Sequence, residues 1–62
     1  MIFEFGYQEL VGGNKYRESI TADTFRQARN IFFNRHSHTP HRVDFILNAT
    51  TNKMVFKKEE TT

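Results

Sequence analysis

Residues 15–33 read KYRESITADTFRQARNIFF, and the spacing of the apolar side chains changes within this stretch. In its first part, Tyr16, Ile20 and Ala22 share one face of an extended chain. The other face consists of Lys15, Arg17, Ser19 and Thr21. After Thr24 the apolar residues recur three or four positions apart, which is typical of an amphipathic helix. The stretch therefore predicts a strand that is followed directly by a helix.

We expect the helix to cover residues 24–36. Thr24 and Gln27 have the spacing of a capping box, in which the threonine hydroxyl accepts a bond from a free backbone amide and the glutamine reaches back. Pro40 disfavours helical backbone at the residue before it, so the helix ends ahead of this proline. The stripe that we expect to face the core consists of Phe25, Ala28, Ile31 and Phe32.

Three other segments have the period-two pattern of strands. The expected strands cover residues 2–10, 15–22, 42–48 and 53–58. Gly12 and Gly13 separate the first two, and glycines accept the positive φ angles of a hairpin turn. In the third strand, the side chains expected to face inward are Val43, Phe45 and Leu47.

The element order ββαββ predicts an α+β domain, a four-stranded antiparallel sheet with the helix packed on one face. Numbered along the chain, the strands are expected in the order 2-1-3-4, because the first and third are the most apolar. Residues 1–58 form this single domain, and residues 59–62 form a polar tail. The main core residues expected are Phe5, Phe25, Phe32 and Phe45. The uncovered face is expected to show Glu4, Gln8, Arg17, Ser19, Thr21, Asp44 and Asn48, with Ile2 and Ile46.

Composition restricts the class of protein. The chain has 62 residues, a formal net charge of +2 and no cysteine. A secreted domain of this size usually needs disulfides, so their absence argues for a cytosolic protein or for one that works inside a host cell. No apolar run approaches the length of a membrane span, and the first residues lack the pattern of a signal peptide. We therefore expect a cytoplasmic protein with no membrane partner.

The sequence predicts neither an enzyme nor a bound cofactor. The two serines, Ser19 and Ser37, have no partners that sequence can place in a triad. His36, His38 and His41 lie within six residues, and a histidine-rich tract can hold a metal ion. Their spacing gives no preorganised ligand geometry, so we predict no metal site and interpret the segment as a helix-to-strand connection.

The outer face of the helix is the candidate binding surface. Arg26, Arg29, Asn30 and Phe33 recur at i, i+3, i+4 and i+7, away from the core stripe. Arginine and aromatic residues are enriched among binding anchors, so these four residues, here named the helix strip, predict a partner surface. The residues expected at its rim are Arg35, His36 and His38. A protein with an acidic groove and a nucleic acid both fit this surface.

Residues 16–29, YRESITADTFRQAR, resemble small phage-encoded proteins in which a strand ending in alanine passes through an acid and a threonine into a helix. The pattern looks like certain small α/β anti-CRISPR proteins, and it is also similar to the small phage inhibitor of bacterial RNA polymerase. The resemblance covers about residues 2–48, and the fourth strand as well in the anti-CRISPR case. It implies a non-catalytic protein that blocks a host machine, either the CRISPR surveillance complex or the polymerase. The polymerase inhibitor is acidic, whereas this chain is basic.

The leading hypothesis is thus a phage or mobile-element protein that inhibits a host protein complex by steric occlusion, as a monomer or homodimer. The alternative is a small nucleic-acid-binding accessory protein that uses the same arginines. A third hypothesis is self-assembly through an exposed edge strand.

Overall fold

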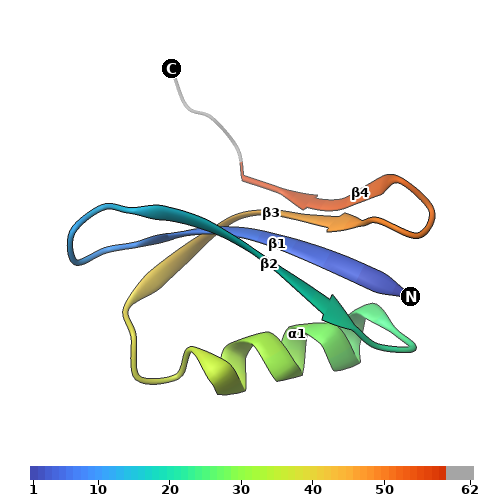
Figure 1. Cartoon of the computed structure of the whole chain (residues 1–62), viewed down its shortest axis with the longest axis horizontal. Helices are drawn as coiled ribbons and strands as arrows, with labels where there is room; N and C mark the ends of the chain where they lie inside the picture. Colours follow the sequence, from blue (N-terminus) through green and yellow to red (C-terminus); the bar gives the residue numbers. More distant parts are fainter. Residues whose placement is uncertain (59–62) are drawn as a thin grey trace.

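The computed structural model of the chain describes residues 1–58 (Figure 1). Its elements are β1 (Ile2–Glu9), β2 (Lys15–Thr21), α1 (Phe25–Arg35), β3 (His41–Asn48) and β4 (Lys53–Lys57). The strands form one antiparallel sheet in the order β2-β1-β3-β4. This confirms the predicted α+β fold and its strand order, and every element ends within one residue of the expected position. The predicted polar tail, residues 59–62, lies outside the described residues.

The start of α1 follows the capping pattern of the sequence. The Thr24 hydroxyl accepts a hydrogen bond from the Gln27 amide at 3.2 Å. The Gln27 side chain in turn accepts from the amide of Asp23 at 3.1 Å, one residue earlier than an ideal capping box requires. These two bonds satisfy backbone donors that a helix start leaves free, and they fix the turn between β2 and α1.

One hydrophobic core lies between α1 and the sheet, and the helix occupies only one side of the sheet (Figure 1). The Phe5 ring stacks on that of Phe32, with centroids 4.5 Å apart and planes 9° from parallel. Phe25 is half-buried at the edge of this core, 6.2 Å from Phe3. The buried set is Phe3, Phe5, Ile20, Ala28, Phe32 and Ile46. The expectations for Phe5 and Phe32 are therefore confirmed.

β3 contains a β-bulge, and because of it the side chains that face the core differ from those expected. Gly6 of β1 pairs with Phe45, but the next residue, Tyr7, pairs with Val43, so Asp44 is an extra residue. One extra residue reverses the alternation of side chains beyond it. Val43 faces the helix as predicted, whereas the prediction that Phe45 and Leu47 face the core is wrong.

We name the side of the sheet opposite α1 the open face. Because of the bulge, Ile46 is 4% exposed in the core and does not belong to the open face, where it was predicted. Asn48 pairs with Phe3 and therefore also lies on the helix side, against the prediction. Phe45 takes their place on the open face, where its ring covers Gly6 so closely that a Cβ atom there would overlap it.

Candidate functional site

The helix strip is exposed along the outer side of α1. Phe33 keeps 44% of its surface accessible. The guanidinium carbon of Arg29 lies 5.9 Å from the centroid of the Phe33 ring, within the range of a cation–π contact. Arg26 and Asn30 are exposed as well. The structure thus brings all four predicted residues to one solvent-accessible surface, with the aromatic ring beside the cation.

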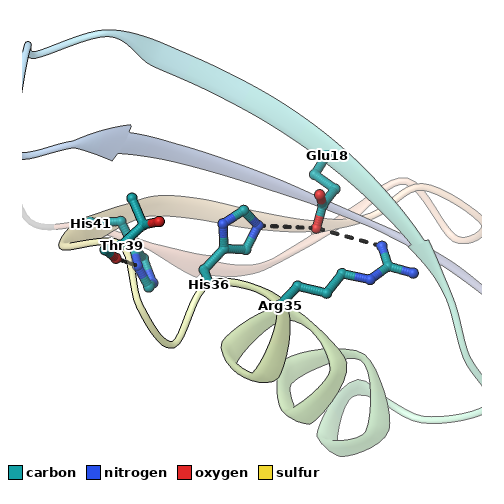
Figure 2. Close-up of polar contacts among 5 residues, drawn as sticks. All are labelled: Glu18, Arg35, His36, Thr39 and His41. Atoms are coloured by element: carbon teal, nitrogen blue, oxygen red, sulfur yellow. Dashed lines mark hydrogen bonds and ion pairs between the residues drawn. The ribbon is translucent and has the colours of Figure 1, made fainter.

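Arg35 and His36, which were expected at the rim, turn toward β2 (Figure 2). Both approach the same oxygen of Glu18, the His36 Nε2 atom at 3.4 Å and the Arg35 Nη1 atom at 3.8 Å. The His36 side chain is only 16% exposed, and its ring lies 4.5 Å from the centroid of Phe32. His36 therefore packs between the helix and the sheet and does not extend the helix strip. Arg35 keeps 57% of its side chain exposed beside this contact.

The loop after α1 and the start of β3 place two more histidines near Phe33. His41 Nδ1 lies 2.8 Å from the carbonyl oxygen of Thr39 (Figure 2), and its ring centroid lies 6.1 Å from that of Phe33. His38 is exposed and lines a shallow depression of about 370 Å³ together with Phe33 and His41. Within residues 1–58, no three His, Asp or Glu side chains gather closely enough to hold a metal ion. The depression thus joins His38 to the helix strip.

Tyr7 lies beneath the C-terminal end of α1, where its ring contacts those of Phe32 and His36. Burial raises the pKa of the Tyr7 phenol, and the nearby carboxylates of Glu18 and Glu9 raise it further. Its ring lies 4.8 Å from that of His36. Tyr7 is therefore a neutral packing residue under the helix end.

The open face contains a second exposed surface, which sequence reasoning missed. Gly6 pairs with Arg17 on one side and with Phe45 on the other, and Phe45 pairs with Lys57. These pairs place two cations and one aromatic ring in a single row across all four strands. A glycine inside a strand often marks a close approach of another group, so Gly6 was the available signal.

Comparisons with protein-family models, with curated proteins and with solved structures found no match to this chain.

The residues that the structure describes include no helix with the length and the apolar character that a bilayer-spanning segment needs.

Proposed function

We propose that this chain is a small non-catalytic binding protein, encoded by a phage or mobile element, that inhibits a host protein complex in the cytoplasm by steric occlusion. The observation that supports the proposal is the exposure of Phe33, at 44%, on the outer side of a helix and beside Arg29. A large exposed aromatic side chain gains free energy when a partner buries it, at about 25 cal/mol per Å² of apolar surface. Exposed aromatic and arginine side chains together are the usual anchors of protein interfaces.

The partner surface that fits the helix strip has an apolar pocket bordered by carboxylates. Phe33 enters the pocket, and Arg26 and Arg29 pair with the carboxylates through their planar guanidinium groups. His38 lies at the edge of the same surface, across the shallow depression next to Phe33. An acidic groove on a host nucleic-acid machine would have this chemistry.

The test is a pull-down with the tagged full chain from nuclease-treated bacterial lysate, with partners identified by mass spectrometry. Two double variants with the same change of charge are compared, Arg26→Glu/Arg29→Glu on the helix strip and Lys15→Glu/Lys57→Glu on the open face. We expect the wild type and the open-face variant to retain one host complex, and the helix variant to lose it. Circular dichroism melting confirms that both variants fold. A complex that binds all three proteins equally would contradict the proposal.

The second candidate is a nucleic-acid-binding accessory protein that uses the helix strip. It is favoured by the exposure of Arg26 and Arg29 one turn apart on the same side of α1. Partners that disappear after nuclease treatment, with affinity that falls steeply with salt, would support this candidate over the first. Binding that is insensitive to salt would exclude it.

A further inference from the structure

The open face concentrates cations in one half of the sheet. Two rows of paired residues cross this half, Arg17–Gly6–Phe45–Lys57 and Lys15–Gln8–Arg42. The adjacent row, Ser19–Glu4–Leu47–Met54, contains no cation. The basic rows line a depression of about 690 Å³. Its basic lining residues are Lys15, Arg17, Arg42, Lys57 and Lys58, and its acidic lining residue is Asp44. The depression therefore has the charge of a site for a polyanion.

Neighbouring acidic and amide side chains position the arginines of this surface. Arg17 Nε lies 2.6 Å from Glu4 Oε1, so the guanidinium group is held close to β1. Arg42 donates a hydrogen bond to the side-chain oxygen of Gln8 at 3.2 Å, and its Nε atom is 3.9 Å from Asp44. Such exposed pairs are weak, and a phosphate oxygen can replace or share them. These contacts orient the arginine side chains across the open face.

Phe45 supplies an aromatic ring to the same depression. Its ring lies against Gly6, because this residue has no side chain to hold it away. The guanidinium carbon of Arg17 lies 5.2 Å from the ring centroid. Nucleic-acid bases stack both on aromatic rings and on guanidinium planes. Phe45 and Arg17 together thus supply a stacking surface between Lys57 and Lys15.

We propose that this depression binds a single-stranded nucleic acid, with the phosphates paired to the lysines and Arg42 and one base stacked on Phe45 and Arg17. A single strand is favoured over a duplex because base faces are accessible only where bases are unpaired. The site lies on the side of the sheet opposite the helix strip, so it goes beyond the proposed function and does not depend on it.

The test is fluorescence anisotropy with the purified full chain and a labelled oligothymidine of about 20 nucleotides, a length that exceeds most single-domain sites. The full chain is required because Glu59 and Glu60 follow Lys58 in the sequence. Neutralisation of three to five phosphates on a single strand predicts affinity that is about 20- to 130-fold weaker at 200 mM than at 50 mM salt. The absence of binding at the lower salt concentration would overturn the proposal.

The same two double variants locate the site. Lys15→Glu/Lys57→Glu is expected to weaken binding by about tenfold or more, since each replaced lysine loses a phosphate contact and adds repulsion. Arg26→Glu/Arg29→Glu has the same change of charge on the opposite side and is expected to retain affinity within about threefold. Equal weakening by both variants would show a general charge effect and overturn the proposal. The lysate pull-down uses nuclease, so its outcome is independent of this one.

The contribution of Phe45 to single-strand binding is tested separately. Phe45→Leu is expected to weaken single-strand binding about fivefold or more, the usual cost of losing one stacked base. If this variant does not fold, the wild type is compared on an oligonucleotide of the same length with abasic sites, which should bind more weakly by a similar factor. Equal affinity for the abasic strand, or for a duplex, would overturn the role of Phe45.

Discussion

At the scale of single residues, Gly6 allows a close contact within the sheet. Because it has no side chain, the ring of Phe45 in the neighbouring strand lies against the backbone of β1. Glycine weakens a strand interior, but here the close approach of Phe45 compensates with van der Waals contact. The same contact brings Phe45 within 5.2 Å of Arg17 of β2. Gly6 therefore connects the packing of the sheet to the stacking surface proposed on its open face.

We predict that Gly6→Ala lowers the free energy of unfolding by about 1–3 kcal/mol, because the new methyl group overlaps the Phe45 ring and forces it to move. Urea denaturation followed by circular dichroism measures this change. Phe45→Ala should cost less stability in the Gly6→Ala background than in the wild type, since the overlap is then absent. Strictly additive effects of the two substitutions would contradict the contact.

At the scale of the elements, the bulge in β3 determines which residues enter the core. Residues 43–47 read VDFIL, so apolar residues occur at both parities and the pattern alone does not select a face. The pairing with β1 selects it: Ile46 lies opposite Phe5 and Phe45 lies opposite Gly6. A second irregularity, between Ile46 and Leu47 in the pairing with β4, places Phe56 next to Ile46. Pairing therefore places Ile46 on the helix side, next to Phe5 and Phe56.

Substitutions at Ile46 and Leu47 test which of the two side chains faces the core. We predict that Ile46→Ala lowers the free energy of unfolding by about 2–5 kcal/mol, because the side chain is 4% exposed in the core. Leu47→Ala removes a half-buried side chain from the open face and should cost less than half as much. Urea denaturation of both variants is the measurement. A larger effect at Leu47 would place the bulge elsewhere in β3.

At the scale of the whole molecule, one small core supports two surfaces on opposite sides. The helix strip lies on the outer side of α1, and the basic depression lies on the open face, with the core and the sheet between them. Figure 1 shows α1 on one side of the sheet only. A domain of about 60 residues buries only about 60% of its unfolded surface, so its stability is low. Both surfaces therefore depend on the same few aromatic contacts, above all that between Phe5 and Phe32.

Substitution of the adjacent residues Phe32 and Phe33 is expected to affect different properties, the stability of the fold and the binding of the partner. We predict that Phe32→Ala, which removes a fully buried ring, costs about 3–5 kcal/mol and leaves the chain largely unfolded. Phe33→Ala removes a ring that is 44% exposed and should lower the stability by less than about 1.5 kcal/mol while it abolishes capture of the host complex. Thermal melting and the pull-down measure the two effects. Capture by Phe33→Ala at the wild-type level would contradict the proposed anchor.

The sequence by itself determined the element order, the strand order and the ends of the elements to within one residue. These features follow from local causes: the hydrophobic period, the Thr24 cap, the turn glycines and Pro40 all act over a few residues. The helix strip was also found in this way, because its residues recur at helical spacing along a single segment.

Only the tertiary structure decided the face of Phe45 and Ile46, the packing of His36 against Glu18, and the existence of the basic depression. Each depends on residues that are distant in sequence. Strand pairing brings Phe45 to Gly6 and places Lys57 and Arg17 in one row across the sheet, and the packing of α1 on the sheet brings His36 to Glu18. A single extra residue in one strand reverses its faces, and nothing in the local pattern of residues 43–47 sets where that residue falls.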